Sequence, residues 1–119
     1  MRVVFILMFT LTLGGMLLLQ STVSAAEPLP TCFSVTYDSN HPDHILGSNG
    51  DDLIVGTSRN DVIFGMNGND VILGQGGDDI ICGGNGNDIL RGRGGADRKD
   101  GGDGDDVLWG GADEGDQLF

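Results

Sequence analysis

Aspartate recurs every nine residues through the second half of this 119-residue chain. The series is Asp52, Asp61, Asp70, Asp79, Asp88, Asp97 and Asp106. Of the 18 acidic residues, 16 are Asp, the shorter carboxylate, which favours turns and hard-cation loops. A solvated acidic surface would mix Asp with Glu. The spacing and the residue type therefore predict binding of a hard divalent cation.

The aspartates belong to a nine-residue repeat that begins at Gly47. Seven copies are regular, GSNGDDLIV, GTSRNDVIF, GMNGNDVIL, GQGGDDIIC, GGNGNDILR, GRGGADRKD and GGDGDDVLW, and an eighth, GGADEGDQLF, is disturbed. Position one is Gly in all eight copies, and position four is Gly in six of the first seven. Position eight is Ile or Leu in all but one of those seven. A phase of nine held over seven copies indicates a repeat architecture rather than a solvated linker.

This pattern resembles the haemolysin-type RTX (repeats-in-toxin) repeat, G-G-x-G-x-D-x-U-x. The resemblance covers residues 47–109 closely and 110–119 loosely. It implies an all-β fold in which residues 47–119 form a parallel β-roll, a β-solenoid of about seven to eight nonapeptide repeats. Six residues of each repeat would form a turn and three a strand, and two repeats would complete one coil.

Such a roll would position the aspartates. The three strand residues place position eight on the inner face, so Ile and Leu from successive coils form a thin core. With two repeats in a coil, turns on the same edge lie 18 residues apart and stack at about 4.8 Å. One edge would then carry Asp52, Asp70, Asp88 and Asp106, and the other Asp61, Asp79 and Asp97.

A column of carboxylates needs a bridging cation. Two carboxylates about 5 Å apart repel by about 3 kcal/mol at an effective dielectric constant of about 20. Several Ca²⁺ ions suit this arrangement, because Ca²⁺ takes six to eight oxygen ligands, whereas Mg²⁺ demands strict octahedral geometry. Zn²⁺ and Cu²⁺ would require His or Cys in the columns.

The resemblance implies that each Ca²⁺ lies between two stacked turns, held by position-six Asp and turn carbonyls. Side chains at position three are expected as extra oxygen donors, namely Asn49, Asn67, Asn85 and Asp103. The sixth copy places Lys99 at an inward position, and the eighth carries one residue too many, so Asp116 falls out of phase. This irregular end predicts a polar cap, which weakens the case for sites at Asp97 and Asp116.

Residues 1–25 differ in character from the repeats. Arg2 precedes an apolar run from Val3 to Leu19, and small residues at 23–26 fit signal-peptidase cleavage after residue 25 or 26. We therefore expect a signal peptide and a secreted, extracellular protein. A retained membrane anchor is the alternative.

The lead-in segment, residues 26–46, has one strand-like stretch at 33–37, where apolar and polar residues alternate. We expect it to lie over the sheet that carries Cys82 and to be tethered by a Cys32–Cys82 disulfide. Free thiols or an intermolecular bridge remain alternatives. The residues of the His41-Pro42-Asp43-His44 run could act as metal ligands, but we favour the interpretation that they form a polar turn before the first repeat.

The net charge of −12 argues against nucleic acid and, after signal cleavage, against anionic membrane as partners. No catalytic residues are predicted, because neither H-E-x-x-H nor G-x-S-x-G occurs and few residues lie outside the repeats. We expect a calcium-binding extracellular module of structural or adhesive use, without enzymatic activity, whose partner is an unidentified protein or polysaccharide. A non-catalytic remnant or accessory module of an RTX exoenzyme or toxin system is the alternative.

Overall fold

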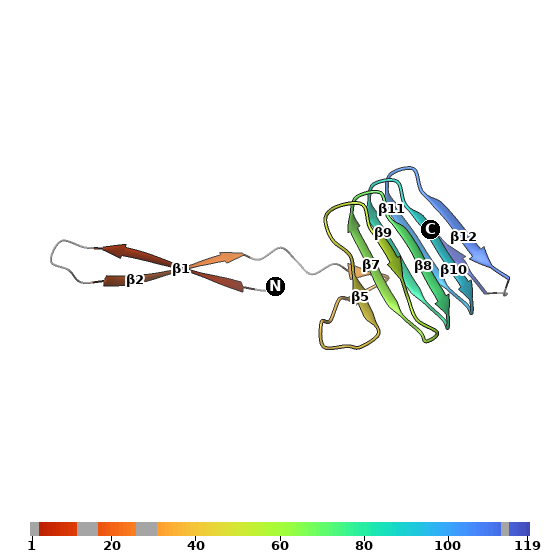
Figure 1. Ribbon diagram of the computed structural model, residues 1–119, viewed down its shortest axis with the longest axis horizontal. Helices are drawn as coiled ribbons and strands as arrows, with labels where there is room; N and C mark the ends of the chain where they lie inside the picture. Colours follow the sequence, from red (N-terminus) through yellow and green to blue (C-terminus); the bar gives the residue numbers. More distant parts are fainter. Residues whose placement is uncertain (1–2, 12–16, 26–30, 113–114) are drawn as a thin grey trace.

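The computed structural model describes residues 3–11, 17–25, 31–112 and 115–119. Every regular element among them is a β-strand, and the strands from β5 onward form two parallel sheets (Figure 1). None of these described segments forms a helix long and apolar enough to cross a membrane. The predicted all-β, parallel β-roll is confirmed.

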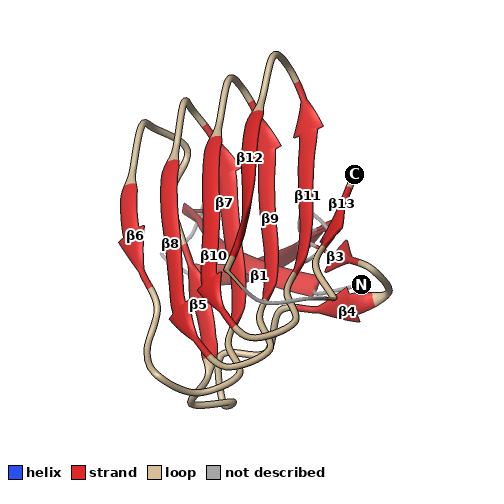
Figure 2. Ribbon diagram, turned by 90° about the vertical axis from the view of Figure 1, so that its right-hand side faces the viewer, coloured by secondary structure: helices blue, strands red, loops and turns tan. Residues whose placement is uncertain are grey.

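Successive strands alternate between the two sheets. The four-stranded sheet has the order β12-β10-β8-β6, with β6 at Leu53–Val55, β8 at Val71–Gly76, β10 at Ile89–Gly94 and β12 at Val107–Gly111. The five-stranded sheet has the order β13-β11-β9-β7-β5, with β5 at His44–Leu46, β7 at Val62–Asn67, β9 at Ile80–Asn85, β11 at Arg98–Asp103 and β13 at Gln117–Leu118. Two repeats therefore make one coil, as Figure 2 shows from the side.

The register between paired strands is 18 residues, so equivalent positions stack. Ile54 aligns with Ile72 in one sheet, and Ile63 aligns with Ile81 in the other. The inner row, position eight of each repeat, forms the hydrophobic core, whose buried members are Ile54, Ile63, Ile72, Ile81 and Leu90. As predicted, one aliphatic side chain from each of the first five repeats builds this core.

The strands are longer than the three residues expected. β7 to β11 each span six residues, because the first three positions of the following repeat continue the ladder. In β7, for example, Met66 pairs with Gly84 and Asn67 with Asn85. The roll also begins earlier than residue 47, since β5 pairs in register with β7. Because strand pairing is made by backbone atoms, these extensions cannot be predicted from the alternation of apolar and polar side chains.

The N-terminal residues form a separate antiparallel hairpin of β1 (Val3–Leu11) and β2 (Leu17–Ala25). Figure 1 shows this hairpin lying away from the roll. The pairing does not test cleavage, so the signal peptide stays a prediction. Residue 26, where the lead-in was predicted to begin, lies outside the described residues.

The segment predicted as one strand at 33–37 is instead the second half of a tight hairpin. β3 (Thr31–Cys32) pairs with β4 (Val35–Thr36), and the turn residues Phe33 and Ser34 have φ values of 48° and 67°. The predicted position of this segment is confirmed. Cys32 is disulfide-bonded to Cys82 of β9, with the two Cα atoms 6.2 Å apart.

The β3–β4 hairpin covers the outer face of the five-stranded sheet. Tyr37 contacts Phe64 edge-on at 6.1 Å between ring centroids, and Phe33 contacts Phe119 at 5.2 Å. Phe64 is consequently only 2% exposed although its position faces away from the core. Within the described part of the chain, no segment covers the outer face of the four-stranded sheet in this way, and Leu53 and Trp109 are 71% and 46% exposed.

Candidate metal centre

The position-six aspartates point into the roll rather than towards solvent. Five of them are at most 1% exposed: Asp61, Asp70, Asp79, Asp88 and Asp97. Asp52 and Asp106, in the first and last regular copies, are half-buried. Carboxylates are almost never buried this deeply unless they are paired. The turns thus place a row of buried acidic groups along each edge of the roll.

Glycine at position one makes room for these side chains. A Cβ atom on Gly74 would overlap Oδ2 of Asp79, and one on Gly83 would overlap Oδ2 of Asp88. The same relation joins Gly65 to Asp70. In these three repeats the glycine at position one is required by the aspartate five residues later, because a Cβ atom would occupy the carboxylate's space.

From Asp70 to Asp106, one oxygen of each position-six carboxylate accepts a hydrogen bond from the preceding coil. The backbone N–H of Asp61 donates to Oδ1 of Asp79 at 2.9 Å, and that of Asp79 donates to Oδ1 of Asp97 at 3.0 Å. On the other edge, the N–H of Asp52 donates to Oδ1 of Asp70 at 2.8 Å. Because the donor and acceptor lie 18 residues apart, these bonds lock stacked turns together.

The second oxygen of the three central aspartates has no partner. Oδ2 of Asp70, Asp79 and Asp88 is buried and accepts no hydrogen bond within the described residues. An unsatisfied buried carboxylate oxygen is costly, and such groups are normally hydrogen-bonded, ion-paired or bound to metal. These three oxygens are therefore candidate ligands for a cation.

The burial of the three central aspartates also changes their pKa values. The pKa of Asp79 is raised to about 7, mainly by burial and additionally by the neighbouring carboxylates of Asp97 and Asp61. The N–H of Asp61 and the ammonium of Lys99 oppose this shift. Burial also raises the pKa of Asp70 and of Asp88. Burial therefore disfavours the charged form of these three carboxylates.

Position-five side chains form a second ladder of hydrogen bonds, in which each side chain accepts from the following coil instead of the preceding one. Oδ1 of Asp51 accepts from the N–H of Asn69 in the following coil at 2.8 Å. Oδ1 of Asn60 likewise accepts from the N–H of Asp78, and Oδ1 of Asp78 from that of Ala96. Each turn is thus held to the coil before it by position six and to the coil after it by position five.

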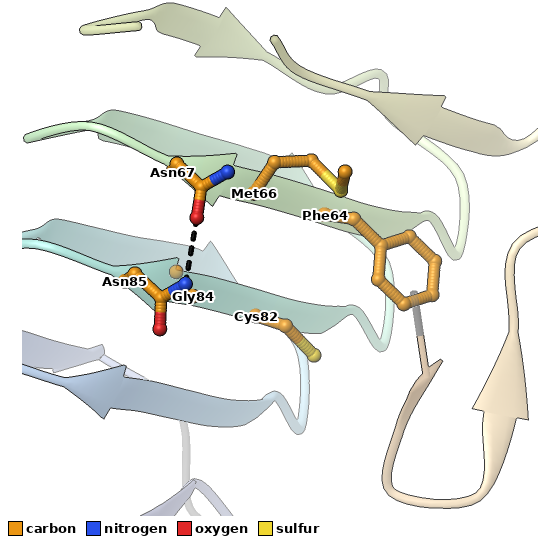
Figure 3. Close-up of a pocket in the computed structure, with 7 residues that line it drawn as sticks. Phe64, Met66, Asn67, Cys82, Gly84 and Asn85 are labelled. Atoms are coloured by element: carbon orange, nitrogen blue, oxygen red, sulfur yellow. Dashed lines mark hydrogen bonds between the residues drawn. The ribbon is translucent and has the colours of Figure 1, made fainter. Parts of the chain in front are cut away.

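The position-three residues form a ladder at the roll surface. Nδ2 of Asn67 donates to Oδ1 of Asn49 at 2.7 Å. Nδ2 of Asn85 donates to Oδ1 of Asn67 at 2.6 Å, as Figure 3 shows. Asn67 and Asn85 also line a shallow surface pocket with Phe64 and Cys82. Asp103, the last of the predicted extra donors, is exposed. The amide oxygens of Asn49 and Asn67 are therefore already engaged.

The sequence prediction missed Asp116 as a member of a column. Its Oδ1 accepts from the N–H of Asp97 at 3.0 Å, although the two residues are 19 rather than 18 apart. The extra residue of the eighth copy precedes Asp116 in the chain. Asp116 therefore continues the column of Asp61, Asp79 and Asp97. The sequence does indicate this member of the column, because Asp116 lies only one residue later than the nine-residue period predicts.

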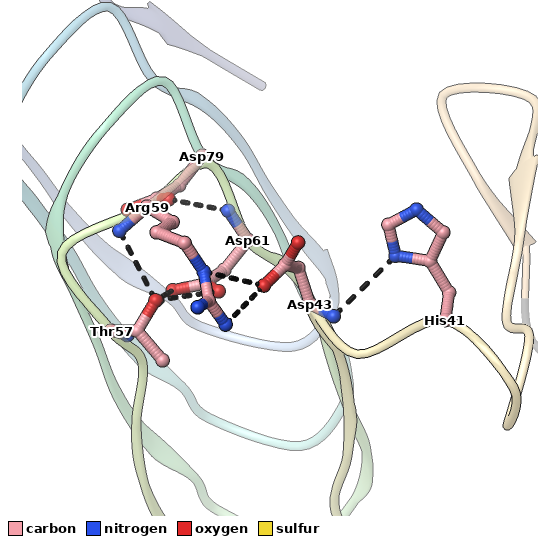
Figure 4. A network of polar contacts seen from close by, with 6 residues as sticks. All are labelled: His41, Asp43, Thr57, Arg59, Asp61 and Asp79. Carbon is pink, nitrogen blue, oxygen red and sulfur yellow. Dashed lines mark hydrogen bonds and ion pairs between the residues drawn. The ribbon is translucent and has the colours of Figure 1, made fainter.

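The His41–His44 segment forms a polar turn. The N–H of Asp38 donates to Nδ1 of His44, and that of Asp43 donates to Nδ1 of His41. Arg59, the exception to Gly at position four, forms an ion pair with Asp43 at 2.6 Å beside the buried Asp61 (Figure 4). Both histidines thus accept backbone hydrogen bonds within this turn.

The donor set fits calcium better than other metals. No group of three or more His, Cys, Asp or Glu side chains comes together in the described part of the chain, so carboxylates alone cannot complete a site. Backbone carbonyls of the turns would have to supply the remaining ligands. A site of carboxylate and carbonyl oxygens, with both cysteines in a disulfide, has the chemistry that Ca²⁺ prefers.

Stacked turns with buried, partly unsatisfied aspartates define this protein as a parallel β-roll of acidic nonapeptide repeats. The sequence profile of the RTX calcium-binding nonapeptide repeat matches four times, at residues 40–58, 46–81, 55–90 and 91–114. Because these matches span well over half of the chain, the protein belongs to this family. No curated protein and no solved structure matches it significantly.

Proposed function

We propose that this protein is a secreted β-roll that binds several Ca²⁺ ions, completes its folding on binding them, and has a structural or adhesive role outside the cell. Membership of a calcium-binding repeat family supports the choice of ion. The role is non-catalytic, with calcium as the principal partner. An apolar, exposed outer face on the four-stranded sheet supports a further protein or polysaccharide partner.

One observation carries the proposal: the three buried Oδ2 atoms of Asp70, Asp79 and Asp88 without a partner. These aspartates would hold the ions, together with position-six neighbours and turn carbonyls. A bound Ca²⁺ supplies the positive charge that offsets desolvation and mutual repulsion of the carboxylates. Since the unfolded chain has no preformed site, the binding free energy adds to the folding free energy.

A calcium titration followed by far-ultraviolet circular dichroism tests the proposal. In chelator we expect a largely disordered spectrum for the repeats, given their charge and few aromatic residues. Millimolar Ca²⁺ should produce β structure, and Mg²⁺ at the same concentration should not. An unchanged spectrum with Ca²⁺, or an equal response to Mg²⁺, would overturn the proposed function.

Secretion has a separate test. Intact mass measurement of the protein from the culture medium should show a chain that starts at Ala26 or Glu27, as the cleavage motif predicts. Recovery of the uncleaved chain in the membrane fraction would contradict secretion while leaving calcium binding unaffected.

A further inference from the structure

A lysine lies in the hydrophobic core of the roll. Lys99 of β11 occupies position eight of the sixth repeat and is 0% exposed. It aligns with Ile81 on one side and Leu118 on the other, where the pattern of the repeat predicts an aliphatic residue. A fully buried ammonium group requires anionic partners, because desolvation of an unpaired charge is prohibitive.

The partners of Lys99 are two carboxylates from stacked turns, that of Asp97 at position six and that of the out-of-phase Asp116. Its Nζ lies 3.2 Å from Oδ2 of Asp97 and 3.3 Å from Oδ1 of Asp116. Asp97 is itself fully buried, and the Asp116 side chain is 12% exposed. The ammonium group therefore sits between the carboxylates of two successive turns in one column, in the role that the proposed function gives to Ca²⁺.

The aspartates of this column differ in the partners of their Oδ2 atoms. Oδ2 of Asp79, one coil earlier in the same column, has no partner, whereas Oδ2 of Asp97 has Lys99. At the amino-terminal end, Oδ2 of Asp61 accepts from both the N–H and the hydroxyl of Thr57, at 2.6 and 3.0 Å. Along this column the chain's own donors satisfy Oδ2 at both Asp61 and Asp97, and leave that of Asp79 between them unsatisfied.

We propose that Lys99 is a built-in cation which replaces calcium between the turns of Asp97 and Asp116. This inference rests on the proposed function, since it presumes that other turn pairs take Ca²⁺. Lys99 offsets one of the two carboxylate charges and bridges both groups without metal, so the turns of Asp97 and Asp116 close the column at a fixed place and bind no ion. The irregular sixth repeat thus provides a positive charge, the Lys99 ammonium group, at the place where other turn pairs would bind Ca²⁺.

The first test counts calcium ions in the Lys99→Met variant of the full chain by isothermal titration calorimetry and native mass spectrometry. Methionine keeps the length and apolar character of the stem and removes the charge. We expect the variant to bind one more Ca²⁺ than the wild type and to require a higher calcium concentration to fold. Arg98→Met, an equal charge change on the adjacent exposed residue, should leave the count unchanged. An equal count in wild type and Lys99→Met would overturn the inference.

The second test keeps the inference falsifiable if Lys99→Met fails to fold. Asp116→Asn retains Oδ1, the acceptor for both Asp97 N–H and Lys99. We expect it to bind as many Ca²⁺ ions as the wild type, whereas Asp79→Asn should lose at least one. Loss of an ion in Asp116→Asn would show that calcium, not Lys99, bridges this turn pair. A wild type that binds no Ca²⁺ would instead refute the proposed function.

Discussion

The backbone N–H of Asp70 donates a hydrogen bond of 2.7 Å to Oδ1 of Asp88, 18 residues further along the chain. The side chain of one turn therefore holds the main chain of the turn before it. Oδ2 of the same carboxylate accepts no hydrogen bond from the described residues, and this is also true of Asp70 and Asp79. The two oxygens of each central aspartate therefore have different roles. One oxygen sets the stacking of the coils, and the other is available to a cation.

Asp88→Ala should weaken calcium-induced folding strongly. The substitution removes the acceptor for the Asp70 N–H and an oxygen for the cation, and it leaves a buried donor unpaired. We expect the calcium midpoint, measured by circular dichroism, to rise at least about tenfold, which corresponds to about 1.4 kcal/mol. Asp38→Ala, at an exposed residue outside the columns, is the control. Equal midpoints for the two variants would show that the column does not bind the ions.

Met66→Gly should stabilise the calcium-loaded roll. Met66 has a φ of 92°, in a region that side chains other than glycine adopt only with strain, whereas most RTX repeats carry glycine at this position by their pattern. Relief of about 1 kcal/mol would raise the melting temperature by about 4–8 °C in a domain of this size. Thr57→Gly, at the same position of the preceding repeat, should have the opposite effect because it removes the hydroxyl bonded to Asp61. A lower melting temperature for Met66→Gly would contradict the assigned strain.

Without calcium, the roll should be more stable in mild acid than at neutral pH. The pKa of Asp79 is raised to about 7 in the folded state, against about 3.9 in an unfolded chain. The folded state thus holds a proton that the unfolded state has lost, and stability falls as the pH rises from about 4 to about 7. Circular dichroism of metal-free protein across this range measures the effect, and Asp79→Asn should flatten it. Stability that increases over this interval would be inconsistent with burial of an uncompensated carboxylate.

Loss of the Cys32–Cys82 bond should release the β3–β4 hairpin from the roll. The bond closes a segment of 50 residues, for which the chain-entropy estimate is about 4 kcal/mol. We expect the double variant Cys32→Ala, Cys82→Ala to melt at a lower temperature and to bind a hydrophobic dye at the uncovered Phe64. Calcium stoichiometry should be unchanged, because neither cysteine lies in a column. An unchanged melting temperature would mean that aromatic contacts alone hold the hairpin.

The sequence allowed prediction of the roll and of its columns because one residue type occupies one position in every copy. Asp and Ile recur in separate columns, so turn, strand and inner face follow from the period alone. The disulfide was predictable because Cys82 falls on an outward position and Cys32 precedes an apolar segment without a core. The turn at Phe33 and Ser34 was missed, since neither residue is typical of positive φ.

Other features depend on contacts that no single position reveals. The inward direction of the carboxylates follows from the space above glycine at position one, five residues away. The pairing of Lys99 with Asp116 requires that an extra residue be absorbed within a turn, which the period contradicts. The strand β5 was assigned to the lead-in because it lacks the preceding glycines, although its backbone pairs with β7.

The alternation of strands between two sheets also restricts how this chain could change length by duplication. Gain or loss of two nonapeptides returns every later residue to its own sheet and edge. A single nonapeptide lost between residues 65 and 82 would move Cys82 to the opposite face, out of reach of Cys32. Between Cys32 and Cys82, descendants that keep the disulfide should therefore differ by whole coils of 18 residues, so the bond between hairpin and roll restricts the number of repeats that precede Cys82.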